Sequence, residues 1–95
     1  MSLIITYDIH NNRTRLKLSK YLERSGRRLQ KSVFEMSQLD SLRYSQLIIE
    51  IRETYKYKLK NLDSILIIDL GENRETKLTR LGTAIKQQNS NKLIQ

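Results

Sequence analysis

A run of basic side chains in the first third of the chain is the feature of the sequence best suited to binding a ligand. Between residues 13 and 31 there are eight lysines and arginines and one acid, Glu23. Four of the cations are spaced i, i+4, i+7 and i+11, which places them on one face of a helix: Arg13, Lys17, Lys20 and Arg24. A charge run is usually a solvated surface, but such a surface normally mixes signs, and here only Glu23 is available to pair.

Two of these cations fall where a helix does not favour them. Arg13 and Arg15 lie in the first helical turn, where the helix dipole disfavours a cation by roughly 0.3–1 kcal/mol each. A sequence that tolerates this cost points the arginines at phosphate. We therefore predict contacts to a nucleic-acid backbone, which position the nucleic acid without reading its sequence. The predicted contact residues are Arg13, Arg15, Lys17, Lys20, Arg24, Arg27 and Arg28.

Asp8 is the candidate for metal chemistry. It ends the first apolar segment and is the only acid among the first 22 residues. A lone aspartate at a strand end is usually a cap or a turn residue, and the alternative is a metal ligand beside a phosphate. Magnesium takes six oxygen ligands, usually from one or two carboxylates together with water and phosphate. The metal hypothesis therefore requires a dimer that brings two copies of Asp8 together.

Few other residues could take part in catalysis or metal binding. His10 is the only histidine and is a candidate general base near Asp8, although a lone loop histidine is more often a surface residue. Glu35 and Asp69 are strand-end acids that could join a metal shell, and a structural role is favoured for each. The sequence has no cysteine, Walker loop, HExxH motif or Ser/His/Asp set, which excludes enzymes that depend on them, as well as disulfide frameworks and zinc knuckles.

A small α+β domain must position these residues. Residues 3–9 and 64–70 are apolar runs typical of central strands, and residues 27–37 form either one bulged strand or a short hairpin. One helix is expected from Asn11 or Asn12 to Ser25-Gly26, and a second begins after Asp40 or Ser41. The apolar stripe of the second helix is Tyr44, Leu47, Ile48, Ile51 and Tyr55. Its tyrosines are therefore core residues rather than platforms for base stacking.

The order of these elements predicts the fold. It is that of a ferredoxin-like βαββαβ sandwich, with two helices on one face of a four-stranded sheet and residues 77–81 as a short extra edge strand. The 95 residues form one domain, which we place at residues 1–83, followed by a polar tail at 84–95 that is expected to be disordered. Such a short chain buries only roughly 60–65% of its unfolded surface, and the uncovered sheet face is apolar, so a homodimer is expected.

Charge and targeting signals limit the partners. The net charge of +8 and the pI near 10 favour a polyanionic partner. No apolar run approaches the roughly 20 residues of a membrane span, and no secretory signal is visible. We therefore expect a soluble intracellular protein without a membrane partner.

Two motifs carry a family resemblance. They are Thr6-Tyr7-Asp8-Ile9 after the first apolar run and Arg28-Leu29-Gln30-Lys31-Ser32-Val33-Phe34-Glu35 after the basic helix. At this separation they resemble the CRISPR-associated protein two family, the small subunit of the spacer-acquisition machinery, and the similarity covers about residues 1–83. The resemblance implies a ferredoxin-like homodimer in which Mg²⁺ (or Mn²⁺) is shared by the two copies of Asp8. The chain departs from the family pattern at neutral His10-Asn11-Asn12, where an acid is frequent, and at Met36, where glycine is common.

The resemblance also implies function, in a cytoplasmic prokaryotic protein of antiviral defence. The first hypothesis is a binding subunit that holds prespacer duplex DNA and bridges two dimers of the CRISPR integrase, CRISPR-associated protein one. The second is a magnesium-dependent endonuclease acting on single-stranded RNA or duplex DNA, in which paired Asp8 carboxylates place the metal and a bound water attacks phosphorus. Two carboxylates without an evident general base are few catalytic groups for hydrolysis, so the first hypothesis, a bridging subunit, is favoured. The third is a non-catalytic or toxin-like RNA-binding regulator of the same fold.

Overall fold

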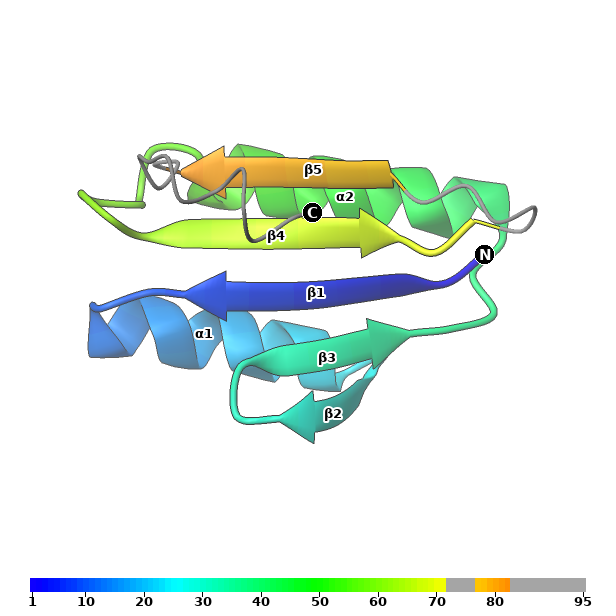
Figure 1. Cartoon of the computed structure of the whole chain (residues 1–95), viewed down its shortest axis with the longest axis horizontal. Coiled ribbons are helices and arrows are strands. Elements are labelled where there is room, and N and C mark those ends of the chain that lie inside the picture. The colour runs from blue at the N-terminus through cyan, green and yellow to red at the C-terminus, as the bar shows by residue number, and fades with distance from the viewer. Residues whose placement is uncertain (72–76, 83–95) are drawn as a thin grey trace, which may run out of the picture.

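The structure, a computed structural model, describes residues 1–71 and 77–82. Within these ranges one five-stranded sheet carries two helices on one face (Figure 1). The elements in chain order are β1 (Leu3–Asp8), α1 (Asn12–Glu23), β2 (Arg27–Gln30), β3 (Val33–Met36), α2 (Ser41–Tyr55), β4 (Ser64–Asp69) and β5 (Lys77–Gly82). The expected tail at 84–95 lies outside the described residues.

The strand order is β2-β3-β1-β4-β5. β1 pairs antiparallel with both β3 and β4, and β5 pairs antiparallel with the outer edge of β4. α1 connects β1 to β2 and α2 connects β3 to β4, so the first four strands have the connectivity expected of a ferredoxin-like βαββαβ unit. The predicted α+β architecture and the extra edge strand are confirmed. The homodimer stays a prediction.

The segment 27–37 forms a hairpin that also contains a bulge, so both of the expected alternatives are partly present. β2 and β3 pair antiparallel across a turn at Lys31 and Ser32, and the register shifts between Arg28 and Gln30. Gly26 lies directly against β3, because a Cβ atom there would be 2.1 Å from the Met36 sulfur and 2.9 Å from the Glu35 carbonyl oxygen. The close approach of the segment between α1 and β2 to β3 therefore requires glycine at this position.

The helices begin at side-chain caps that the sequence predicted. The Asn11 side chain accepts a hydrogen bond from Thr14 N at 2.9 Å, and the Asp40 carboxylate accepts one from Arg43 N at 2.7 Å. Asn11 caps the start of α1, so only three residues separate the end of β1 from the first residue of α1. Neither helix is long and apolar enough to cross a membrane, in the part of the chain that the structure describes.

The core lies between the helices and one face of the sheet. Side chains alternate along a strand, so Leu3, Ile5 and Tyr7 of β1 are buried under the helices while Asp8 points to the other face and is exposed. The helices contribute Leu18 and Leu22 from α1 and Leu47, Ile51 and Tyr55 from α2, all buried. Tyr44 and Ile48 are half-buried against this core, which confirms the predicted stripe of the second helix.

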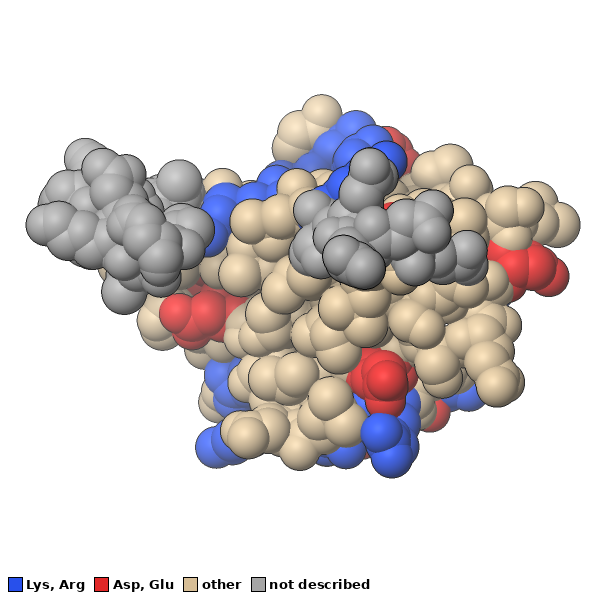
Figure 2. All heavy atoms as spheres, turned by 45° about the vertical axis from the view of Figure 1, so that its right-hand side comes forward, with Lys and Arg blue, Asp and Glu red and all other residues tan. Residues whose placement is uncertain are grey.

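Neither α1 nor α2 covers the opposite face of the sheet, and residues 1–71 and 77–82 place no other helix over it (Figure 1). Its side chains include half-buried Ile4, Val33, Leu66 and Ile68, together with Leu78, which is 61% exposed. The described side chains that are visible in an oblique view of this face are mostly uncharged (Figure 2). We refer to this face as the open sheet face.

Candidate functional site

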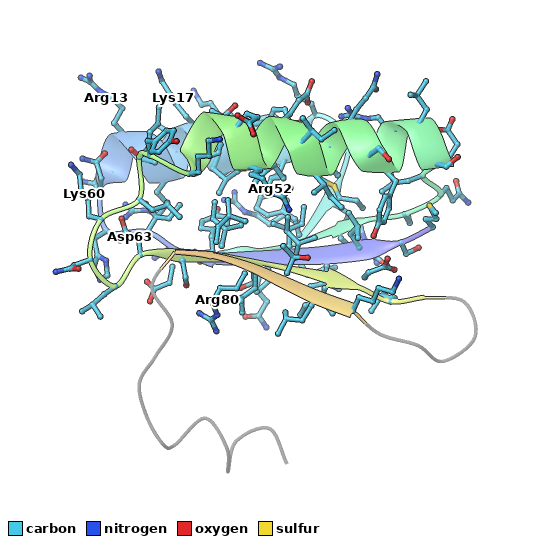
Figure 3. The ribbon with its side chains drawn as sticks, turned by 90° about the horizontal axis from the view of Figure 1, so that it is seen from above. Arg13, Lys17, Arg52, Lys60, Asp63 and Arg80 are labelled. Atoms are coloured by element: carbon cyan, nitrogen blue, oxygen red, sulfur yellow. The ribbon has the colours of Figure 1, made fainter. Side chains whose placement is uncertain are left out.

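One end of the molecule brings together four segments that are distant in sequence. Asp8, at the end of β1, pairs with Ser64, the first residue of β4. Tyr7 N donates to Ser32 O at 3.2 Å, which places the β2–β3 turn beside β1. Figure 3 shows Asp63, Lys60 and Arg13 at this same end. The end therefore combines the candidate metal ligand with the start of the basic helix.

A hollow of about 380 Å³ lies beside Asp8. Its walls are Tyr7, Asp8, Ile9, His10, Arg15, Lys31 and Ser32. A second hollow, of about 240 Å³, shares Tyr7, Arg15, Lys31 and Ser32 with the first and extends along α1 to Arg28. One carboxylate and three cations thus border a continuous surface, which suits an anionic group held beside a bound cation.

Asp63 is the residue that holds this end together, and the sequence reasoning missed it. The residue is 1% exposed, and its carboxylate accepts hydrogen bonds from Lys60 N at 2.9 Å and from His10 N at 3.0 Å. The His10 imidazole lies with Nδ1 2.8 Å from Asp63 Oδ1. The loop after β1 is therefore tied to the loop before β4 through one buried carboxylate. The only signal in the sequence was an acid placed immediately before an apolar strand.

The hydrogen bonds of the Asp63 carboxylate shift two pKa values, its own and that of His10. Burial raises the pKa of Asp63, but the hydrogen bonds from Lys60 N and from His10 outweigh burial and hold the pKa below its usual value. The hydrogen bond to Asp63 raises the pKa of His10 above its usual value. Because Nδ1 faces Asp63, Nε2 is the nitrogen left for a ligand, and the side chain is 65% exposed. His10 is thus a surface residue, as expected, but an oriented one.

Arg15 has a local role that the helical pattern did not suggest. Its guanidinium donates to the carbonyl oxygens of Ile9 at 3.0 Å and His10 at 3.4 Å, and to the Asn12 side chain. These acceptors explain why a cation is tolerated in the first turn of α1, since its charge lies against the carbonyl oxygens of the preceding loop. Arg15 also lines both hollows, and its contact with phosphate stays a prediction.

The basic face of α1 consists of Arg13, Lys17, Lys20 and Arg24. All four residues are exposed, and none of them forms an ion pair within the described residues. Figure 3 shows Arg13 and Lys17 pointing away from the sheet. The spacing argument is confirmed in its geometric part: these four cations share an outward surface opposite Leu18 and Leu22.

Arg27 and Arg28, also predicted to contact nucleic acid, are partly engaged within the chain. Arg27 lies 2.8 Å from Glu35 across the β2–β3 pair, and Arg28 lies 3.0 Å from Glu23 of α1. The Arg28 guanidinium also lies over the Phe34 ring, 5.0 Å from its centroid. Glu23 was expected to be the only available partner, and the sheet register adds Glu35. These two arginines carry less unpaired charge than the basic face.

The other strand-end acids do not join Asp8. Asp69 pairs with Leu3 at the opposite end of β1, where it accepts hydrogen bonds from Tyr44 and Gly71 N, and Glu35 is opposite Ile4. No group of three or more metal-binding side chains exists within residues 1–71 and 77–82. A single chain therefore brings one exposed carboxylate, that of Asp8, to the hollow, and the magnesium site shared by two copies stays a prediction.

Comparison with known proteins agrees with this architecture. The family model for CRISPR associated protein Cas2 matches residues 1–78. The chain is 36% identical, over 80 residues, to the CRISPR-associated endoribonuclease Cas2 2 of Methanospirillum hungatei JF-1, and the match covers 84% of each protein. No solved structure matches the chain significantly. Because the family model covers most of the chain and agrees with the resemblance of its motifs, the chain belongs to the Cas2 family of CRISPR-associated proteins.

Proposed function

We propose that this protein is a CRISPR adaptation subunit that binds prespacer duplex DNA and bridges two dimers of the CRISPR integrase. The observation that carries the proposal is the basic face of α1. Its cations extend over eleven residues of sequence, which is about 16 Å along a helix, or roughly five base pairs of duplex. A surface of this length with no acid partner in the described residues is suited to following a phosphate backbone.

A homodimer is part of this proposal. The open sheet face presents Ile4, Leu66, Ile68 and Leu78 without a covering element, within the part of the chain that the structure describes. Burying this face against a second copy would remove apolar surface from water, at roughly 25 cal/mol per Å². A two-fold dimer would also carry two symmetric basic faces and two copies of Asp8. Both features are required of a bridge with a shared metal site.

A second candidate function is hydrolysis of phosphodiester bonds in single-stranded RNA or duplex DNA. It is favoured by the exposed Asp8 in a cation-lined hollow and by the relative from Methanospirillum hungatei, which is named an endoribonuclease. The two copies of Asp8 would hold Mg²⁺ (or Mn²⁺), and such an ion, when bound, neutralises charge that develops on the phosphoryl oxygens. Arg15 and Lys31 line the hollow and would bind the phosphate. Of the lining residues, His10 alone ordinarily titrates near neutral pH.

The two functions are separated by comparing Asp8→Ala with the double variant Arg13→Ala/Lys17→Ala. Prespacer integration is measured with the partner integrase, and magnesium-dependent cleavage is measured on single-stranded RNA and on duplex DNA. We expect Asp8→Ala to retain integration and to lose any cleavage, and the double variant to lose integration. Cleavage that persists in Asp8→Ala would remove the catalytic assignment. Integration that is unaffected in the double variant would contradict the bridge, and RNA binding without integration would favour a regulator.

A further inference from the structure

A second basic segment lies between α2 and β4, outside the 13–31 run. It is Lys56-Tyr57-Lys58-Leu59-Lys60, in which three of five residues are lysines, and we call it the basic loop. The lysines are exposed, whereas Leu59 is half-buried against the core and anchors the segment. Lys56 lies 3.0 Å from Glu53, so Lys58 and Lys60 are the cations of the loop that enter no ion pair within the described residues.

Tyr57 is the most exposed large apolar or aromatic side chain in the described part of the chain, at 87%. The other tyrosines have defined structural places. Tyr7 and Tyr55 are buried, and the hydroxyls of Tyr21 and Tyr44 donate to Glu50 and Asp69. No hydrogen bond within the described residues engages the Tyr57 hydroxyl, and the Lys56 ammonium lies 5.2 Å from the ring centroid. Tyr57 therefore presents an aromatic ring to solvent between two lysines in the sequence, of which Lys56 lies beside the ring and Lys58 lies 5.9 Å from the centroid of the Tyr55 ring.

The basic loop is physically continuous with the Asp8 site. Lys60 N donates to one oxygen of the Asp63 carboxylate, and His10 N donates to the other. One buried side chain thus positions the end of the basic loop and the loop that follows Asp8. Lys60 and Arg13 lie at the same end of the molecule in Figure 3. A nucleic acid on the basic face of α1 would have the basic loop at the end where α1 begins.

We propose that the basic loop binds an unpaired nucleotide of single-stranded nucleic acid, with its base stacked on Tyr57 and its flanking phosphates contacted by Lys58 and Lys60. An exposed aromatic ring beside cations is the composition of sites that bind single strands, because every unpaired base offers a π-face for stacking. A blunt duplex keeps its bases paired and stacked internally, so it does not offer such a face to Tyr57. The inference rests on the proposed nucleic-acid function and deepens it: the duplex lies on α1, and its unpaired extension lies on the basic loop.

The test measures the affinity of the full chain for a single-stranded oligonucleotide and for a blunt duplex of the same sequence. Stacking lost on substitution by alanine lowers single-strand affinity roughly 5- to 150-fold. We expect Tyr57→Ala to show a loss in this range for the single strand and less than about a 2-fold change for the blunt duplex. Tyr57→Phe keeps the ring and is expected to bind like the unmodified chain. Leu62→Ala is the matched control, because Leu62 is 66% exposed nearby and has no aromatic ring.

Three results of the binding measurements would overturn the inference. They are an unchanged single-strand affinity in Tyr57→Ala, an equal loss in Tyr57→Phe, and an equal loss for blunt duplex. A direct readout is photocrosslinking of an oligonucleotide that carries a halogenated pyrimidine, for which we expect the crosslinked peptide to contain Tyr57 and its absence there would also overturn the inference. If Arg13→Ala/Lys17→Ala weakens duplex binding while Tyr57→Ala changes nothing, the inference fails and the proposed function stands. If the unmodified chain binds no nucleic acid, both fail.

Discussion

Replacing Asp63 by alanine should destabilise the protein far more than replacing Asp8, although both aspartates lie at the same end of the sheet. Asp63 is buried and accepts hydrogen bonds from Lys60 N and from both the backbone and the imidazole of His10. Asp8 is exposed and accepts no hydrogen bond within the described residues. Asp8→Ala is therefore the matched control for charge and position.

The size of the effect follows from the hydrogen bonds that are lost. A hydrogen bond to a charged group contributes about 1.5–3 kcal/mol, and water replaces part of each one because Lys60 and His10 are exposed. Three lost bonds therefore sum to about 2–4 kcal/mol after this allowance. Asp8→Ala, as a surface change, should lie within about 0.5 kcal/mol of the unmodified chain.

The assay is urea unfolding followed by far-ultraviolet circular dichroism, at one protein concentration because a dimer makes stability depend on concentration. For a domain of this size, about 2–4 kcal/mol also lowers Tm by at least about 8 °C. Asp63→Asn should fall between alanine and the unmodified chain, since an amide keeps one acceptor oxygen but presents a donor to either Lys60 N or His10. If Asp63→Ala and Asp8→Ala unfold at the same urea concentration, the structural role given to Asp63 is wrong.

Two further predictions concern the stability of the fold. The hydrogen bond from Tyr44, followed by that from Gly71 N, lowers the pKa of Asp69, so its stabilising contribution is present above the unfolded pKa of about 3.9 and is lost as the pH falls through the folded pKa. Tyr44→Phe should therefore flatten the loss of stability below about pH 4 in urea titrations, and an unchanged acid limb would contradict this. Gly82 has φ +101°, and a Cβ atom there would lie 2.2 Å from Asp63 O. Gly82→Ala should therefore lower the free energy of unfolding by about 1–3 kcal/mol. An equally stable Gly82→Ala protein would refute the close approach of β5 to Asp63.

Local chemistry in the sequence predicted the elements well. The caps at Asn11 and Asp40, the stripe of α2 and the edge strand near residue 77 all depend on residues close to one another along the chain. The choice between a bulged strand and a hairpin at 27–37 could not be made this way. It depends on the pairing of β2 with β3 and on the space that Gly26 leaves beside Met36.

The charged residues of the site could be predicted from the sequence, but the hydrogen bonds that join distant segments there could not. The basic face follows from helical spacing alone, and Asp8 follows from its position at a strand end. Asp63 was missed because its partners, His10 and Lys60, come together only when β1 and β4 pair. The basic loop was missed because the sequence reasoning considered only the total charge outside residues 13–31, which is nearly neutral. Within that part of the chain, Lys56–Lys60 is a local excess of positive charge.

The central claim is that the basic face of α1 contacts the phosphates of duplex DNA. It is tested most directly by the salt dependence of duplex binding, because each phosphate contact contributes a slope of about −0.9 to the plot of log K against log salt. We predict that Arg13→Ala/Lys17→Ala reduces the magnitude of this slope by about 1.8 per chain. Arg52→Ala, which removes an exposed charge from α2, should leave it unchanged. Equal slopes for the double variant and the unmodified chain would contradict the claim and would indicate that the basic face is an ordinary solvated surface.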